Sequence, residues 1–320
     1  MKKISIIVPC YNEEKSIMIL YEKIQDLFRD RLSGYDYEII FADDFSEDRT
    51  RAIIKEICQK DKHAKAVFNA ANFGFSRNIF SALCLMSGDA AFLLFGDLQD
   101  PPELLPDFIQ SWEAGNRVII GQKKGSRENI IMSIMRKLYY TFIKLFSEKT
   151  QINNFNGYGL YDSSFIDILR QVDDMQPYLK QVIAEYSPGY HIIPYTQNKS
   201  RRGKSNFSFY KNYDFAMDGI TSSTKKLMRL STLVGVILGV ACAIYAVVVL
   251  IQKLINWDAY PFGLASITVA IFFIGAMQLF FIGVLGEYIL SINNKTLRRP
   301  RVVIDEKINF AAGENSPTSA

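Results

Sequence analysis

Asp97 and Gln99 are the side chains in this sequence whose types and spacing most directly suggest chemistry. They lie in the segment 97–103 (DLQDPPE) with one residue between them, so in an extended chain both point to the same side. Such a pair suits Mg²⁺ or Mn²⁺ bound to a diphosphate, because these ions prefer oxygen ligands. The apolar run 90–95 predicts a buried strand before the pair, and open α/β sheets bind ligands beyond the carboxyl ends of their strands. The competing interpretation is an acidic loop that only caps the helix opened by the following proline pair.

The residues before this segment predict the sheet that must position it. Short apolar runs at 4–8, 37–42 and 65–68 are each followed by a polar loop and then by apolar residues at helical spacing. With the strand at 90–95, these units predict an α/β fold with a doubly wound, mostly parallel sheet. Carboxylates in the loops can then rim a nucleotide pocket and accept hydrogen bonds from base and ribose. They are Glu13, Asp43, Asp44 and Asp97.

Composition and missing motifs argue against several other kinds of site. The chain has no GxGxxG and no GxxxxGK[ST] sequence, so neither a Rossmann dinucleotide site nor a P-loop is supported. The four cysteines, Cys10, Cys58, Cys84 and Cys242, show no CxxC spacing, which suits a reducing compartment and argues against a zinc site. The net charge of +4 is modest and the cations cluster beside apolar runs, so we expect lipid headgroups and no nucleic acid as their partner.

Several cations and one serine are candidates to bind a phosphate group. A basic loop at 123–127 leads into a basic, aromatic helix at 129–146, and a second loop at 198–205 reads NKSRRGKS. Arginine gives phosphate bidentate contacts and lysine gives it a point charge. A loop that faces solvent or lipid headgroups is the alternative for the second segment. The candidates are Lys123, Arg127, Arg136, Arg201, Arg202, Lys204 and Ser205.

Two uncharged runs, 230–251 and 259–286, predict a transmembrane hairpin. Each is long enough to cross about 30 Å of hydrocarbon as a helix. Lysines and arginines are concentrated outside the pair and not in the connection between the runs, so we expect both termini in the cytoplasm. The N-terminal residues show no signal-peptide pattern, which also keeps the soluble part inside.

These patterns divide the chain into three parts. We expect residues 1–226 to form a cytoplasmic domain with interfacial helices at about 129–146 and 206–226, although a core-facing helix with a basic outer face also explains the first of these. Residues 227–292 should hold two transmembrane helices, at about 230–252 and 261–288. Residues 293–320 form a basic and then polar cytoplasmic tail, which we expect to be disordered from residue 305 onward.

In this order the motifs resemble the membrane-anchored family 2 glycosyltransferases of GT-A fold that act on polyprenyl phosphates. This family includes bacterial undecaprenyl-phosphate glucosyltransferases and, more distantly, dolichyl-phosphate mannose synthase. The resemblance covers nearly the whole chain. The matching segments are 6–14 (IIVPCYNEE), 43–50 (DDFSEDRT), 72–74 (NFG), 97–103 (DLQDPPE), 201–205 (RRGKS) and the closing pair of spans.

The resemblance implies a hexosyltransferase at the inner membrane of a bacterium. Its donor would be a nucleotide sugar, UDP-linked by analogy with the bacterial members, and its acceptor a polyprenyl phosphate. It would use Mg²⁺ or Mn²⁺, held by Asp97 and Gln99, and would associate into a homo-oligomer. The catalytic residues would be Asp97, Asp100 and Arg202. The donor nucleotide would be held by Pro9, Tyr11, Glu13, Asp43, Asp44 and Asn72.

Three positions depart from the family pattern. Phe95 stands where the family has an aspartate two residues before Asp97, Ala71 stands where an arginine commonly precedes the NFG turn, and Lys123 stands where relatives often have arginine. The remaining oxygen ligands of a metal can still come from diphosphate and water. The first two departures motivate a different interpretation, a non-catalytic membrane scaffold that has kept the fold.

The chemistry expected of a phosphate acceptor needs few residues. A phosphate monoester has a second pKa of about 6, so its oxygen is largely an anion near pH 7 and needs no general base. A single in-line displacement by this oxygen inverts the anomeric carbon. A hydroxyl acceptor, such as a diacylglycerol or a growing polysaccharide, is the other enzymatic interpretation; it would need a base, and the QxxRW motif of processive synthases is absent.

Overall fold

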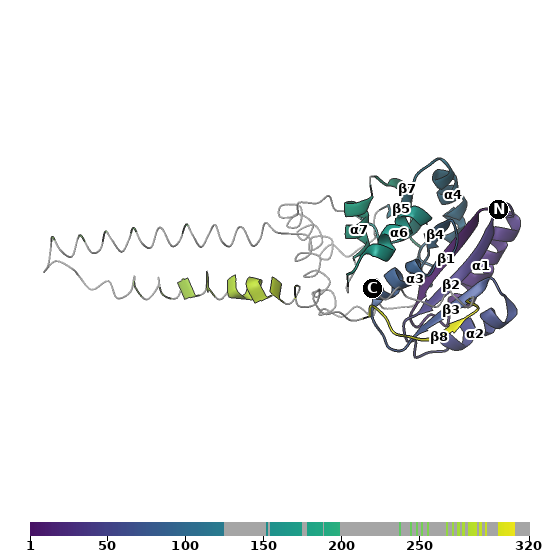
Figure 1. Ribbon diagram of the computed structural model, residues 1–320, viewed down its shortest axis with the longest axis horizontal. Coiled ribbons are helices and arrows are strands. Elements are labelled where there is room, and N and C mark those ends of the chain that lie inside the picture. The colour runs from purple at the N-terminus through teal and green to yellow at the C-terminus, as the bar shows by residue number, and fades with distance from the viewer. Residues whose placement is uncertain are drawn as a thin grey trace. The chain divides into compact units, whose positions relative to one another are not determined.

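The computed structural model describes residues 1–124, 152, 154–174, 178–187, 189–198 and 300–310, with short helical pieces between 237 and 292. Two compact units divide the chain. One consists of Met1–Asn129, Gln151–Asn206 and Leu297–Ala320, and the other of Ile130–Thr150 and Phe207–Thr296. The first unit contains the sheet and is an α/β domain (Figure 1).

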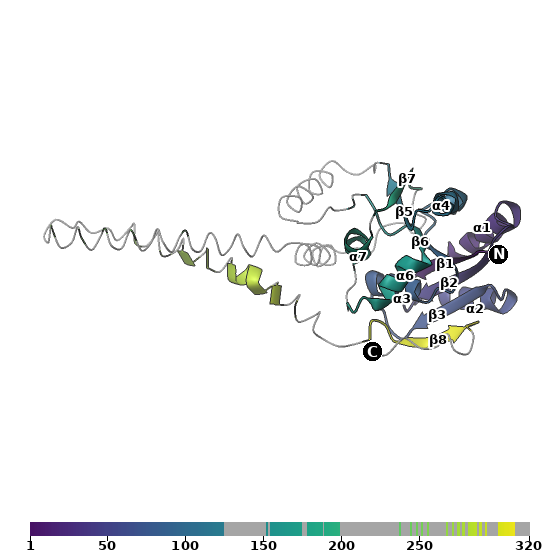
Figure 2. The same ribbon diagram turned by 45° about the horizontal axis from the view of Figure 1, so that its top comes forward.

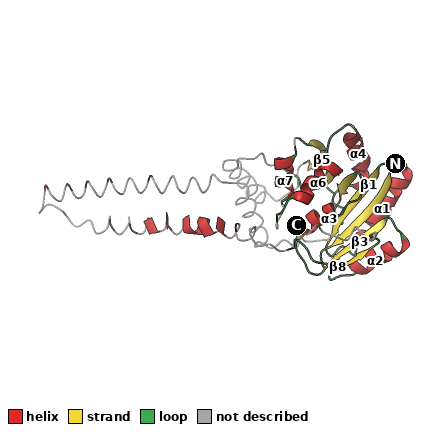
Figure 3. Ribbon diagram, viewed as in Figure 1, coloured by secondary structure: helices red, strands yellow, loops and turns green. Residues whose placement is uncertain are grey.

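One eight-stranded sheet forms the centre of this unit, in the order β7-β5-β6-β4-β1-β2-β3-β8 (Figure 3). The pairs β1·β2, β1·β4, β2·β3 and β5·β7 are parallel, whereas β6 pairs antiparallel with both β4 and β5, and β8 antiparallel with β3. The predicted doubly wound, mostly parallel sheet is confirmed. The strands are β1 (Lys3–Cys10), β2 (Asp36–Asp43), β3 (Ala64–Asn69), β4 (Ala90–Leu93), β5 (Val118–Lys123), β6 (Gly159–Asp162), β7 (His191–Tyr195) and β8 (Ile304–Ile308).

Helices cover both faces of the sheet (Figure 2). α1 and α2 pack together on one face, whereas α3 and α6 pack together on the other. The strands between them are therefore buried on both sides, which explains why β1 is almost continuously apolar. The helices are α1 (Ile17–Asp30), α2 (Thr50–Lys60), α3 (Phe75–Cys84), the 3₁₀ helix η1 (Pro102–Leu104), α4 (Leu105–Glu113), α6 (Ser163–Gln171) and α7 (Leu179–Tyr186).

The chain reverses direction across the sheet at β1. From β1 it proceeds outward to β2 and β3, and it then returns to β4 on the opposite side of β1. Ligands of open α/β sheets bind at such a switch point, beyond the carboxyl ends of the strands. The strands β1, β2 and β4 end at this edge, and the loops that follow them begin there.

The prediction of a disordered tail from residue 305 is wrong for its first residues. Residues 304–308 form β8, which pairs with the edge strand β3. The amide of Asn309 then donates hydrogen bonds of 2.8 Å to the carbonyls of Cys58 and Ala64. This polar segment is ordered because β3 offers an unpaired edge and buried carbonyls that need donors. Its amino-acid composition gives no sign of that edge.

The second unit is described at only a few positions, all helical. Within those positions and the rest of the described chain, no helix is both long enough and apolar enough to cross a membrane. The predicted spans at 230–252 and 261–288 lie largely outside the described residues, and the interfacial helices at 129–146 and 206–226 lie wholly outside them.

Candidate active site

Backbone strain marks the carboxyl edge of the sheet. Asn12, Phe45 and Leu98 follow β1, β2 and β4 and have φ angles of 55°, 64° and 57°. These are left-handed conformations, which cost Phe45 and Leu98 about 1–2 kcal/mol each, whereas asparagine adopts them more readily. Such strain tends to gather where a loop must present particular groups to a ligand. This edge is therefore the candidate site, in agreement with the sequence.

Asp97 and Gln99 lie on either side of the strained Leu98. One Asp97 oxygen accepts a hydrogen bond of 3.1 Å from the Gln99 backbone N–H, and the other accepts none from the part of the chain that is described. The Gln99 side-chain oxygen accepts a 2.6 Å hydrogen bond from the amide of Gln197, and its carbonyl accepts one of 2.9 Å from the Asn198 N–H. The chain directly before the predicted basic loop is therefore held beside Gln99.

The donor set at this position suits a hard divalent cation. Asp97 and Gln99 offer a carboxylate oxygen and an amide oxygen, which are ligands that Mg²⁺ and Mn²⁺ accept when phosphates and water complete the shell. Among the described residues, no group of three or more His, Cys, Asp or Glu side chains is placed to hold a metal ion by itself. A metal here would therefore depend on the oxygens of a bound diphosphate.

Asp100, predicted as catalytic, is 1% exposed and has protein donors on both oxygens. The Tyr195 hydroxyl donates to Oδ1, and the Asn156 amide donates to Oδ2 at 2.8 Å. Burial raises the pKa of Asp100, while the bond from Tyr195 and the charge of Lys123 oppose that rise. Asp100 thus ties β7 and the segment before β6 to the end of β4. Its position is that of a structural support for the site.

Lys180 is a cation of this region that sequence reasoning missed. Burial, and then the neighbouring charge of Lys123, lower the pKa of Lys180 to about 8. It lies in the first turn of α7, where Leu179 packs near Gly157. A bound anion would favour the charged form of Lys180. Lys180 has no motif around it, so only the tertiary structure reveals that it is buried and within electrostatic reach of Lys123.

Asp43, predicted to hold the nucleoside, is fully buried. It accepts hydrogen bonds from the Ser46 backbone N–H, at 3.1 Å, and from the Ser46 hydroxyl. The Arg51 Nε atom lies 3.2 Å from Asp43 Oδ2. Burial raises the pKa of Asp43, although Ser46 and Arg51 counteract it. Through Ser46, Asp43 therefore holds the loop after β2 in place. Arg51, like Lys180, is a residue that the sequence motifs did not indicate.

Asp44 binds the backbone of the predicted NFG turn. Its carboxylate accepts hydrogen bonds from Asn69 Nδ2 (2.9 Å), Phe73 N (3.0 Å) and Gly74 N (2.8 Å). Gly74 has a φ of 90°, which a residue with a side chain would rarely adopt. Asp44 is 4% exposed, whereas Asn72 in the same turn is exposed. The acid therefore fixes the turn, and Asn72 remains the residue of that turn open to a ligand.

The predicted nucleotide residues of the first loop differ in exposure. Pro9 and Glu13 are buried, while Tyr11 is half-buried. Glu13 accepts a 2.9 Å hydrogen bond from the Ser16 hydroxyl and packs against Gly96, where a side chain would come within 3.2 Å of it. Tyr11 is thus the best placed of the three to meet a ligand.

Phe95, at the position of the missing aspartate, is packed into the protein. Its ring stacks on Phe75 with centroids 5.4 Å apart. The Phe75 side chain is exposed and belongs to the first turn of α3. An aromatic pair therefore replaces a carboxylate beside the candidate metal ligands.

One of the remaining predicted phosphate-binding residues, Lys123, belongs to the described part of the chain. Lys123 is at the end of β5 and near Asp100, as described above. The other predicted phosphate-binding residues, and the predicted catalytic Arg202 among them, lie outside the described residues: Arg127, Arg136, Arg201, Arg202, Lys204 and Ser205.

Residues 5–161 match the family model described as glycosyl transferase family 2. A prophage bactoprenol glucosyl transferase homolog of Escherichia coli strain K12 is 28% identical over 303 residues, which are 94% of this chain and 98% of that protein. The bactoprenol glucosyl transferase of Shigella phage SfX is 28% identical over 306 residues, 95% of this chain and 99% of that protein. Among solved structures, TarS 1–349 of S. aureus in complex with UDP-GlcNAc has a TM-score of 0.45 and 19% identity, and the match covers 69% of this chain and 66% of that chain.

Proposed function

Because this chain belongs to glycosyl transferase family 2, and is therefore a glycosyltransferase, we propose that it transfers a hexose from a UDP-sugar to polyprenyl phosphate. The observation that carries the proposal is the extent of the similarity to bactoprenol glucosyl transferases. It covers 94–95% of this chain and so continues far beyond the family model, which ends at residue 161. Undecaprenyl phosphate is the acceptor to test first.

The donor side uses the edge formed by β1, β2 and β4. Asp97 and Gln99 would hold Mg²⁺ or Mn²⁺ together with the donor diphosphate, and such an ion would supply charge neutralisation for the leaving nucleoside diphosphate. Tyr11 and Asn72 are accessible to the nucleoside. Asp43 and Asp44 support these loops. Asp43 binds the Ser46 hydroxyl, which accepts a hydrogen bond from the Asn12 N–H, and Asp44 accepts hydrogen bonds from the Phe73 and Gly74 N–H groups.

The acceptor side uses cations. A phosphate monoester is already largely ionised near pH 7, since its second pKa is about 6, so the enzyme needs to bind and align an anion and not to remove a proton. Lys123, at the end of β5, and Lys180, in the first turn of α7, are two described cations that we propose bind that anion. Gln99 holds residues 197 and 198, so the basic loop that follows begins next to the donor site. Attack by the phosphate oxygen inverts the anomeric carbon.

The proposed acceptor places the enzyme at the inner face of a bacterial membrane. The helical pieces of the second unit expose isoleucines, among them Ile237, Ile244, Ile267 and Ile271, with 57–64% of each residue exposed. Repeated exposed isoleucines on helices are unfavourable in water and favourable in lipid. This supports a membrane hairpin over residues 227–292. The lysines and arginines that flank the hairpin favour both termini in the cytoplasm, together with the catalytic domain of residues 1–226 and the tail from 293.

The test is sugar transfer by the full chain purified in detergent. We expect one labelled nucleotide sugar, UDP-linked, to label undecaprenyl phosphate in the presence of Mg²⁺ or Mn²⁺, and EDTA to stop the transfer. The product should have the inverted anomeric configuration. A protein that binds the donor and labels a diacylglycerol or polysaccharide instead would show that the acceptor is wrong, and a labelled lipid formed equally well in EDTA would refute the metal.

A further inference from the structure

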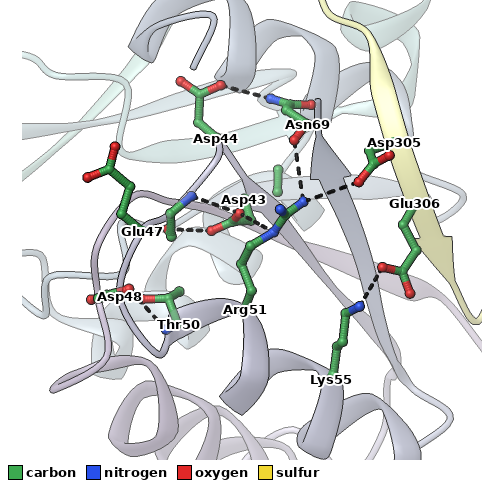
Figure 4. Close-up of polar contacts among 12 residues, drawn as sticks. Asp43, Asp44, Glu47, Asp48, Thr50, Arg51, Lys55, Asn69, Asp305 and Glu306 are labelled. Atoms are coloured by element: carbon green, nitrogen blue, oxygen red, sulfur yellow. Dashed lines mark hydrogen bonds and ion pairs between the residues drawn. The ribbon is translucent and has the colours of Figure 1, made fainter. Parts of the chain in front are cut away.

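Arg51 joins the donor edge of the sheet to the C-terminal strand (Figure 4). The guanidinium lies 3.2 Å from the Asp43 carboxylate and 3.9 Å from the Asp305 carboxylate, and it donates to the Asn69 carbonyl at 3.4 Å. It also lies over the ring of Phe68, 5.0 Å from the centroid. Among the described residues, Arg51 is the cation paired with Asp43.

The chain of contacts continues from Asp43 to the loop after β1. The Ser46 hydroxyl, which donates to Asp43, accepts a 2.9 Å hydrogen bond from the Asn12 backbone N–H. The Asn12 side chain in turn accepts one of 2.9 Å from the Glu47 N–H. The loop that carries Tyr11 is therefore fastened to the loop after β2 through residues that depend on Asp43.

The strand β8 is firmly attached at this edge of the sheet. Lys55 on α2 lies 2.5 Å from Glu306, and Asn309 caps the carbonyls at the end of α2 and the start of β3. The Ala70 N–H also donates to the Val303 carbonyl at 2.9 Å. These contacts fix the backbone of β8, so Asp305 stands at a defined place beside Arg51 (Figure 4).

Asp305 affects the conformation of the Arg51 side chain more than the stability of the fold. It is partly exposed, with 63% of its side chain accessible, and an exposed ion pair contributes little stability by itself. Arginine has many rotamers, however, and only those that keep the guanidinium over Phe68 and against Asp43 maintain the network. A carboxylate on the outer side favours these rotamers over ones that reach into solvent.

We infer that β8 is a positioning element of the donor site, in which Asp305 holds Arg51 against Asp43 and thereby fixes the loop that carries Tyr11. The inference rests on the proposed function for the identity of the donor. Two segments that the sequence separates by the whole predicted membrane region thus cooperate in binding one ligand. Because coupling between sites is reciprocal, donor binding must also stabilise the docked state of β8.

Charge variants on adjacent residues of β8 test this. In the full chain in detergent, we expect Asp305→Asn to weaken binding of UDP-sugar with Mn²⁺ by about threefold, as loss of a partly exposed ion pair implies. Asp305→Lys should weaken it by about tenfold, since a like charge then repels Arg51. Both should raise the donor KM and leave the acceptor KM unchanged. Glu306→Gln is the matched control, because it breaks the Lys55 pair on the same strand without touching Arg51.

Hydrogen exchange separates this inference from the proposed function, since it requires no turnover. In the unliganded protein, Asp305→Lys should speed amide exchange in residues 10–14 and 43–48, whereas Glu306→Gln should affect only β8 and α2. In the wild-type protein, UDP-sugar should slow exchange in β8. Equal donor affinity and equal exchange in wild type, Asp305→Asn and Asp305→Lys would overturn the inference, as would an equal loss in Glu306→Gln. A wild-type protein that binds no nucleotide sugar, but shows the predicted exchange changes, would refute the function and retain the coupling.

Discussion

The hydroxyl of Tyr195 on β7 donates a hydrogen bond to the buried carboxylate of Asp100, 95 residues earlier in the chain. Both side chains are almost fully buried, at 3% and 1% exposure. The bond connects the far edge of the sheet to the loop that contains the candidate metal ligands. With the bond from Asn156, it leaves both carboxylate oxygens of Asp100 with a protein donor.

Replacing Tyr195 by phenylalanine should destabilise the protein by about 2 kcal/mol, because a buried carboxylate oxygen then lacks a donor. Burial already raises the pKa of Asp100, and loss of the Tyr195 bond should raise it further. Chemical denaturation of the variant and the wild type at pH 7 measures the first effect. A Tyr195→Phe protein of unchanged stability would mean that the Asp100 carboxylate finds another donor.

Asp97→Asn should abolish metal-dependent transfer while leaving the fold intact, because the side chain is half-buried and its acceptor role toward the Gln99 N–H can be kept by the amide oxygen. Loss of a metal-stabilised leaving group should cost at least about a hundredfold in kcat, the scale of removing one strong electrostatic contact. Thermal unfolding checks the fold, and Mn²⁺ titration with UDP checks the metal. Asp107→Asn on α4, an exposed acid away from this loop, is the control and should be fully active.

Glu38 should make the free energy of unfolding depend on pH in the acidic range. Burial by itself raises the pKa of this carboxylate, but hydrogen bonds from Lys65, Ser5 and Ser87 outweigh it and hold the pKa at about 2. The folded value lies below the ordinary 4.5, so this stabilisation is complete above pH 4.5 and is lost as the pH falls toward 2. Glu38→Gln should lower stability by about 3 kcal/mol at pH 7 and reduce the acid dependence in that window. Denaturation curves at several pH values measure both, and a variant with wild-type acid dependence would contradict the assignment.

Deprotonation of Lys180 should lower kcat/KM for the acceptor at alkaline pH. Its pKa of about 8 means that the lysine is charged below pH 8 and neutral above it. If it binds the acceptor phosphate, kcat/KM for that substrate falls above about pH 8, since this ratio reports ionisation of the free enzyme. Lys180→Met should be low throughout, and Lys180→Arg should keep activity above pH 8 because arginine stays protonated. The donor KM serves as the internal control; a shared decline of donor and acceptor use would remove Lys180 from the acceptor site.

The backbone conformation of Phe45 should be less strained with glycine at this position. Its φ of 64° is left-handed, and a Cβ costs about 1–2 kcal/mol there. Phe45→Gly and Phe45→Ala both remove a ring that is 40% exposed and packs against Arg51. The glycine variant should therefore be the more stable of the two by about 1 kcal/mol, measured by thermal unfolding. The reverse order would show that the loop relaxes out of this conformation once the ring is gone.

The sequence by itself determined the fold class and predicted the place of the site. Alternating apolar runs and helical spacing predicted the parallel strands, because strand and helix periods are local properties of the chain. The acids after β1, β2 and β4 predicted the functional edge, because parallel strands end there together. The order of the motifs also indicated the glycosyltransferase family, which the family match over residues 5–161 supports.

The tertiary structure decided which of those acids have partners within the protein. Asp43, Asp44 and Asp100 have similar local sequence surroundings to Asp97, yet their oxygens are taken up by Ser46 and Arg51, by the NFG turn, and by Tyr195 and Asn156. It also brought Lys180 within electrostatic reach of Lys123, and β8 beside Arg51. These relationships depend on which segments become neighbours once the sheet has formed. The sequence does not show whether a polar side chain will form its hydrogen bonds with water or with a buried partner.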